Sequence, residues 1–449
     1  MTILGAVLAL VLAGLVVTRR TAWLPIVLGV TAGLPYSAAV SVGGNSVPLF
    51  FVAGLLAVVL LLAPAPGALA PHWTRVVLVC FVAWSLLITV AAPWFFRGIR
   101  VLSSRGGVDL QVLDPDTLAF TASTAGQVAY VLIAVAVLLY LVRAGAALTT
   151  VTVAFAVGTV GTTLRGIMVV SSGDLLGPLM DTTNAIYADP GTRLRGVFNE
   201  PSELAAFSLP AAVFFAMMAS TGVRRRRWPW WLLALTACAN LLQAASGVAV
   251  VASGVVVSAG IVVLLVRSLV LGGVGVQWFV LGGLAAAFVL IGWWSELTAP
   301  IVELVDDKIG SQSWNARTGA DVFSLQLIGQ TGGLGVGLGG NRPSSFAVAL
   351  PSTIGVPGTV LFLLLVVGAV LATRTDRGLL PASVSLVALL IAKSVGNPDL
   401  STPVLWLLIG VCFVPLWRRA LIHDAGPAAA ASTAVSPATA ARLLTRTES

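Results

Sequence analysis

One stretch of the chain places two arginines directly before the start of an expected helix. It reads Arg193-Leu-Arg-Gly-Val-Phe-Asn-Glu-Pro-Ser-Glu203, and Pro with Asn or Ser nearby is a normal helix entry. A helix N-terminus offers free N–H groups and partial positive charge, and guanidinium groups bind phosphate bidentately. Arg193 and Arg195 could therefore bind a diphosphate, although they could equally be interfacial residues that anchor the helix.

Two carboxylates, Glu200 and Glu203, lie three residues apart in the first turn of the same expected helix. Interaction with the helix dipole is a sufficient structural reason for both. A carboxylate here could also act as general base on a sugar hydroxyl. Glu200 is the leading candidate for that role.

Two further arginines stand out by their positions. Arg165 interrupts an apolar segment, where an ionisable residue is a functional candidate unless its side chain reaches the interface. Arg317 lies four residues before Asp321, so a surface ion pair within one helix is its simplest interpretation.

Glycine dominates the segment 329–340, and Asn341 and Arg342 follow it directly. This much glycine is incompatible with an ordinary membrane helix. We expect a loop, a re-entrant segment, or backbone packed closely around a ligand. Pro351 and Pro357 should break the next helix near its outer end.

The composition indicates that a bundle of membrane helices positions these residues. The chain is 58% hydrophobic and 9% charged, whereas soluble domains carry about 25% charged residues. A span needs about 20 apolar residues, and the fold class we predict is an all-α polytopic bundle of about 12–13 transmembrane helices. The expected spans are 2–18, 21–41, 47–64, 75–92, 126–142, 147–170, 201–220, 228–245, 248–266, 275–295, 346–372, 378–394 and 402–417.

The basic residues predict the orientation of this bundle. Most arginines fall on alternate loops, among them Arg143 and the run 224–227, and such loops are cytoplasmic. The N-terminus is then outside and the C-terminus inside, and His72 and His423 are cytoplasmic. No histidine is left for outer-face catalysis or an outer zinc site. The net charge of +8 follows from these loops and does not predict nucleic-acid binding.

The domain organisation follows from the same loops. Residues 1–424 form one membrane domain with external segments at about 93–125, 171–200 and 296–345, the last a large loop before the final three spans. Residues 425–449, rich in Ala, Thr, Ser and Pro, are expected to be a disordered cytoplasmic tail.

The motifs resemble those of the bacterial O-antigen polymerase and ligase superfamily, specifically Wzy-type polysaccharide polymerases. The stretch 193–202 is similar to one polymerase signature. Gly335–Ser345 followed by Ile354–Gly358 is similar to a second, with Arg317 between them. Ligases of this superfamily usually carry a His-Asn pair where this chain has Ser344-Ser345, which favours the polymerase.

The resemblance implies a metal-independent, cofactor-free glycosyltransferase in the bacterial inner membrane. It would polymerise polyprenyl-diphosphate-linked repeat units on the outer face, binding a lipid-linked donor and acceptor, with a chain-length regulator or flippase as further partners. Arg193, Arg195, Arg317 and Arg342 would bind the diphosphate, with Arg165 in the same pocket. Arg195, Arg317 and Glu200 would be catalytic.

Three alternatives stay open at this point. A ligase would move glycan to another acceptor, and a flippase would move a lipid-linked saccharide across the membrane. A flippase should carry charges deep in several spans, and only Arg165 and Lys393 are candidates here. A structural membrane subunit would leave the Arg and Gly clusters unexplained.

Overall fold

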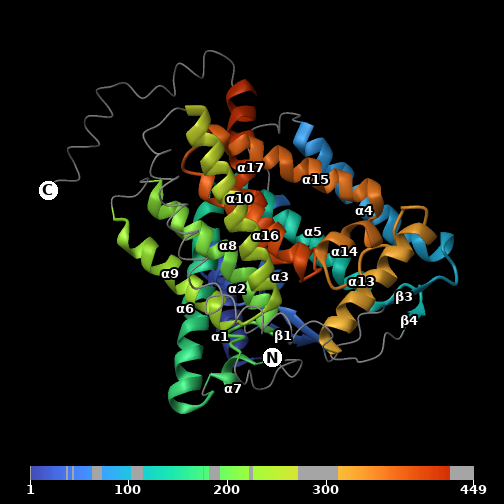
Figure 1. Ribbon diagram of the computed structural model, residues 1–449, viewed down its shortest axis with the longest axis horizontal. Coiled ribbons are helices and arrows are strands. Elements are labelled where there is room, and N and C mark those ends of the chain that lie inside the picture. The colour runs from blue at the N-terminus through green and yellow to red at the C-terminus, as the bar shows by residue number, and fades with distance from the viewer. Residues whose placement is uncertain are drawn as a thin grey trace, which may run out of the picture.

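The described part of the chain folds into a helical bundle with two small two-stranded antiparallel sheets (Figure 1). The computed structural model describes residues 2–36, 39–42, 45–62, 73–102, 115–174, 176–181, 193–221, 226–271 and 312–424. The expected span 275–295, the tail 425–449 and parts of the three external segments lie outside these residues. The first half contains α1 (Ile3–Val17), η1 (Thr21–Trp23), α2 (Leu24–Gly33), β1 (Ala39–Val42), β2 (Asn45–Pro48), α3 (Leu49–Leu62), α4 (Trp73–Phe95), β3 (Arg100–Leu102), β4 (Pro115–Thr117), α5 (Ala122–Arg143), α6 (Ala147–Ser172) and α7 (Gly177–Met180). The second half contains α8 (Pro201–Ser220), α9 (Trp228–Gln243), α10 (Gly247–Leu271), α13 (Gln312–Gln330), α14 (Phe346–Thr353), α15 (Gly355–Ala372), η2 (Thr373–Thr375), α16 (Leu380–Val395) and α17 (Pro403–Asp424).

The helices have the lengths and surfaces of a membrane protein. Within the described residues, α4, α5, α6, α8 and α15 are each long and apolar enough to cross a bilayer. Large apolar side chains also point outward, such as Trp94 and Phe95 of α4, which are both 78% exposed. Water would disfavour such surfaces, whereas lipid tails solvate them. The predicted helical membrane fold is confirmed at this level.

Helix α8 packs extensively against α9 and α16. Most side chains along α8 are buried, including Phe207, Phe214 and Phe215. The Ser385 hydroxyl of α16 donates to the Pro210 carbonyl of α8 at 2.8 Å. This packing holds the start of α8, with Glu203 in its first turn and Glu200 directly before it, at one end of the bundle.

Two expected spans are interrupted. The helix predicted over 21–41 ends at Gly33 because Pro35 disfavours helical backbone in Leu34, and a hairpin of β1 and β2 follows. The helix predicted over 346–372 is broken, as expected, but between the two prolines: α14 ends at Thr353 and α15 begins at Gly355.

The glycine-rich segment is a loop packed against protein backbone. Gly335 has φ +83°, and an added Cβ would lie 2.4 Å from the Thr353 carbonyl oxygen. Gly355 has φ +72°, and its Cβ would lie 2.2 Å from the Leu334 oxygen. Only glycine tolerates this combination of left-handed backbone and contact. The loop therefore fixes the break between α14 and α15 and the start of the segment that carries Arg342.

Candidate functional site

Polar residues gather where six helix ends meet. The C-terminal ends of α2 and α16 and the N-terminal ends of α3, α5, α8 and α17 line one cavity. Arginines lie at the opposite ends of the same helices, with Arg143 closing α5, Arg227 following α8, and Arg374 and Arg377 preceding α16. The bundle is therefore basic at one end and carries its buried acids and cavity at the other.

The cavity has a volume of about 200 Å³ and a mixed wall. Its apolar part includes Phe51, Tyr130, Phe198 and Phe207. Its polar part comprises Tyr36, Gln127, Glu203, Arg342, Lys393, Asn397, Asp399, Ser401 and Thr402. A concave site with aromatic walls and a few converging polar groups is the usual form of a small-molecule site.

Glu203 is held at the cavity wall by two donors. The Tyr36 hydroxyl donates to Oε1 at 3.1 Å, and the Asn199 backbone N–H donates to Oε2 at 3.2 Å. The charge on Glu203 and then burial raise the pKa of Tyr36 well above its usual value. Tyr36 therefore keeps its proton and remains a hydrogen-bond donor.

Lys393 enters the cavity from α16 and is fully buried. Its ammonium donates to Asn397 Oδ1 at 2.9 Å and to Thr402 Oγ1 at 2.8 Å, and lies 5.1 Å from the centre of the Phe346 ring. The Thr402 hydroxyl donates in turn to the Asp399 carbonyl at 2.9 Å. Lys393 thus fixes the turn between α16 and α17 that carries Asp399.

Arg342 lines the cavity and also a smaller adjoining one of about 50 Å³. Its backbone N–H donates to the Leu102 carbonyl at 3.1 Å. The side chain of neighbouring Asn341 binds Leu102 N, Ser324 and Ser352. The charge of Asp399 raises the pKa of Arg342, so the guanidinium stays cationic between the two cavities.

Glu200 and Arg317, both predicted to be catalytic, form an ion pair. Arg317 Nη2 lies 3.2 Å from Glu200 Oε2, which also accepts from the Ser202 hydroxyl at 2.9 Å. The expected pairing of Arg317 with Asp321 is wrong, because the backbone holds Asp321 elsewhere. Asp321 Oδ1 accepts from the backbone N–H groups of Ser344 and Ser345, at 2.7 and 3.2 Å.

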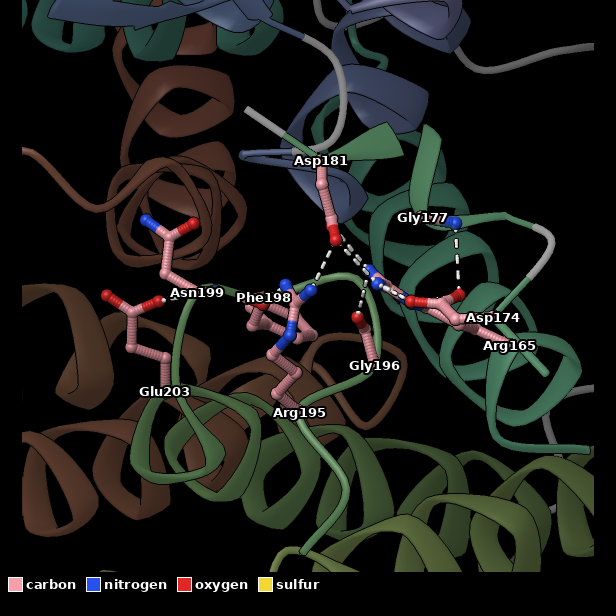
Figure 2. Close-up of polar contacts among 9 residues, drawn as sticks. All are labelled: Arg165, Asp174, Gly177, Asp181, Arg195, Gly196, Phe198, Asn199 and Glu203. Atoms are coloured by element: carbon pink, nitrogen blue, oxygen red, sulfur yellow. Dashed lines mark hydrogen bonds and ion pairs between the residues drawn. The ribbon is translucent and has the colours of Figure 1, made fainter. Parts of the chain in front are cut away.

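Arg165 and Arg195 belong to a separate buried cluster (Figure 2). Asp181 accepts two hydrogen bonds from Arg165, at 2.7 and 2.8 Å, and pairs with Arg195. Asp174 pairs with Arg165 as well. The two arginines also donate to the carbonyls of the loop before α8, Arg165 to Gly196 at 2.9 Å and Arg195 to Phe198 at 3.3 Å.

These ion pairs affect the pKa of Asp181 as well as the loop before α8. Burial acts to raise the pKa of Asp181, but the hydrogen bonds and charges of Arg165 and Arg195 outweigh it and hold this pKa below its usual value. Neither arginine is among the residues that line the cavity. Arg193, half-buried at the start of the same loop, is not among them either.

The structure thus separates the predicted site residues into three groups. Glu200 and Arg317 pair with each other, Arg342 lines the cavity, and Arg165 and Arg195 share Asp181. Sequence reasoning missed the roles of Tyr36 and Asp399. Lys393, a charged residue in an apolar segment, was the available signal for the cavity.

No protein-family profile matches the chain, and no curated protein matches it. Fold and composition define the class, which is a helical membrane protein. Its function is inferred from the charged site and from the sequence resemblance.

Proposed function

We propose that this protein polymerises polyprenyl-diphosphate-linked oligosaccharide repeat units on the outer face of the bacterial cytoplasmic membrane. The observation that carries the proposal is the cavity wall formed by Arg342, Glu203, Lys393 and Asp399, next to the Glu200–Arg317 pair. A polyprenyl diphosphate glycan has an apolar tail, an anionic linker and a polar head. An apolar bundle that ends in cations, carboxylates and a cavity offers a surface for each part.

The reaction needs a base and a stabilised leaving group. A carboxylate takes the proton of the acceptor hydroxyl, and the acceptor oxygen bonds to the anomeric carbon. The bond from that carbon to the phosphate oxygen breaks, and the lipid diphosphate leaves with the electron pair. Arg317 and Arg342 would stabilise its negative charge.

Glu200 is our candidate for the base, and the pair with Arg317 supports that role. Arg317 lies 3.2 Å from the carboxylate, and its guanidinium can turn to the diphosphate when substrate arrives. Glu203, fixed by Tyr36 and Asn199, is better placed to orient a sugar in the cavity. Arg165 and Arg195 would shape the loop before α8, and they reach a diphosphate only if Asp174 and Asp181 exchange with it.

The pair Ser344-Ser345 favours a polymerase over a ligase. Both backbone N–H groups bind Asp321, and the Ser344 hydroxyl donates to the Arg317 carbonyl at 3.2 Å. Where ligases usually have His-Asn, this chain has residues that fix α13 to the start of α14. The position then supports Arg317 and contributes no acid or base.

A deletion strain tests this proposal. Its lipid-linked saccharides, extracted and sized, should be single repeat units exposed on the outer leaflet. Full-length polymer still on lipid would identify a ligase. Single units confined to the inner leaflet would identify a flippase. Lipid-linked saccharides unchanged from wild type would mean that the protein has no role in their polymerisation or transport.

A further inference from the structure

Helix α13 directs its charged side chains toward the rest of the protein. Arg317 pairs with the carboxylate of Glu200, and Asp321 accepts from two backbone N–H groups just before α14. Ser324 accepts a hydrogen bond from the Asn341 side chain at 2.8 Å. Steps of four and three residues place Arg317, Asp321 and Ser324 on one face of the helix. Both charged residues of α13 are therefore held within the protein.

The outward face of α13 is divided into two stripes. The apolar stripe follows steps of four and three residues and comprises Trp314, Thr318, Val322, Leu325 and Gly329, all of them exposed. Val322 is 49% exposed and Leu325 is 54% exposed. The polar stripe comprises Asn315, Gln326 and Gln330, which are exposed as well. A helix with uncharged apolar and polar stripes side by side fits a boundary between hydrocarbon and water.

The apolar stripe ends beside an apolar groove. The Gly332 N–H donates to the carbonyl of Gly329, the last residue of the stripe, at 3.1 Å. Gly332 lines the groove together with Leu334, Val356 and Val360. Val356 and Val360 belong to α15 and are half-exposed. The groove thus joins the end of the stripe to the outward surface of α15.

Helix α15 identifies what covers this surface. It is long and apolar enough to cross a bilayer, so lipid tails solvate its outward side chains. Helix α13 packs against α14, and α14 packs against α15 (Figure 1). Water would disfavour an apolar stripe that extends such a surface. Lipid is therefore the occupant that the neighbouring membrane helix favours.

From this arrangement we infer that α13 is an interfacial helix in the leaflet on the cavity side of the bundle. The apolar stripe lies against lipid tails, and the polar stripe faces headgroups and water. The inner face keeps Arg317 on Glu200. This part of the expected external segment 296–345 is thus embedded in the membrane surface. The inference goes beyond the proposed function and does not depend on the reaction.

Under the proposed function, the position of α13 affects how substrate arrives. It holds the Glu200–Arg317 pair near the headgroup layer, where the diphosphate of a membrane lipid lies. The anionic linker would reach Arg317 by lateral movement within the leaflet, and the lipid tail would stay in hydrocarbon.

Spin-label accessibility on the full-length protein in lipid nanodiscs tests this inference. Nitroxides are attached one at a time to Val322→Cys, Leu325→Cys and Gln326→Cys, after the exposed Cys80 and Cys238 are replaced by alanine. Oxygen concentrates in hydrocarbon, and a nickel chelate stays in water. Collisions with oxygen should dominate at positions 322 and 325, and collisions with the chelate should dominate at position 326.

Two further labels provide the references. Val360→Cys on α15 reports hydrocarbon, and Arg226→Cys before α9 reports an exposed position at the opposite end of the bundle. Labels at 322 and 325 should resemble the first in their ratio of oxygen to nickel collisions. A ratio like that of position 226 would mean that the stripe faces water. Few collisions with either reagent would mean that protein covers it, and either result overturns the inference.

A matched pair of charge substitutions gives an independent test. Val322→Glu and Gln326→Glu each place a carboxylate on the exposed side of α13. A charge is costly in hydrocarbon and cheap in water, so Val322→Glu should lower the melting temperature in nanodiscs by at least about 2 °C relative to Gln326→Glu. Equal melting temperatures would overturn the inference. Neither test uses substrate, so failure of the polymerase proposal and failure of this inference are distinguishable.

Discussion

The carboxylate of Asp181 lies between the guanidinium groups of Arg165 and Arg195 and contacts both (Figure 2). Both arginines are 2% exposed, and they donate to the carbonyls of Gly196 and Phe198. One acid from the segment after α6 therefore holds the loop that leads into α8. The position of Glu200 and Glu203 depends on that loop.

Replacing this acid should destabilise the protein. Asp181→Asn leaves two buried guanidiniums without their shared counter-charge, and breaking a buried pair costs about 3–5 kcal/mol. Because Asp181 itself is 24% exposed, we expect about 2 kcal/mol. Thermal unfolding in detergent measures the difference. The control Asp116→Asn, at an exposed position of β4, should change stability by less than about 0.5 kcal/mol. Equal effects of the two variants would contradict a stabilising role of Asp181 between Arg165 and Arg195.

The same acid predicts a pH dependence. The pKa of Asp181 is lowered in the folded state, so its contribution is fully present above the unfolded value of about 3.9 and is lost as pH falls through the lower folded pKa. The melting-temperature gap between wild type and Asp181→Asn should be constant from about pH 7 to pH 5 and should shrink below about pH 4. A gap that widens toward acid would mean that the carboxylate does not titrate with a lowered pKa.

The glycine loop gives a prediction with an internal control. Gly335→Ala puts a Cβ 2.4 Å from the Thr353 oxygen at φ +83°, which should cost about 1–3 kcal/mol and displace the segment leading to Arg342. Gly254→Ala, in the interior of α10 with nothing within 4 Å of the added Cβ, should stabilise by up to about 1 kcal/mol. Thermal unfolding of both variants measures these changes. An unchanged stability of Gly335→Ala would contradict the close contact between this loop and the Thr353 carbonyl.

The two glutamates should differ in kinetics. Glu200→Gln removes the proposed base and should lower kcat by about 10²–10⁴. Glu203→Gln alters the cavity wall and should mainly raise KM for the lipid-linked glycan. Polymerisation rates across substrate concentration separate the two. The reverse pattern would make Glu203 the base.

The sequence predicted the helices well because their signals are local. Each expected span within the described residues contains a helix, and five of these helices are long and apolar enough to cross a bilayer. The glycine and proline pattern predicted the interrupted 346–372 segment. The cavity escaped prediction because Tyr36, Glu203, Lys393 and Asp399 come from segments far apart in the chain. They come together only because the ends of α2, α8, α16 and α17 meet at the cavity. Likewise, nothing local to Asp181 indicates that it pairs with Arg195 rather than facing water.

The central claim is tested most directly with purified protein in nanodiscs and a synthetic polyprenyl-diphosphate-linked repeat unit, with products sized by mass spectrometry. Wild type should form lipid-linked dimers and longer chains and release one polyprenyl diphosphate per bond. Arg342→Ala should lose at least about 10²-fold in rate, while Arg226→Ala, just before α9 at the opposite end of the bundle, should retain it. Release of lipid diphosphate without longer chains, or full activity in Arg342→Ala, would contradict the account.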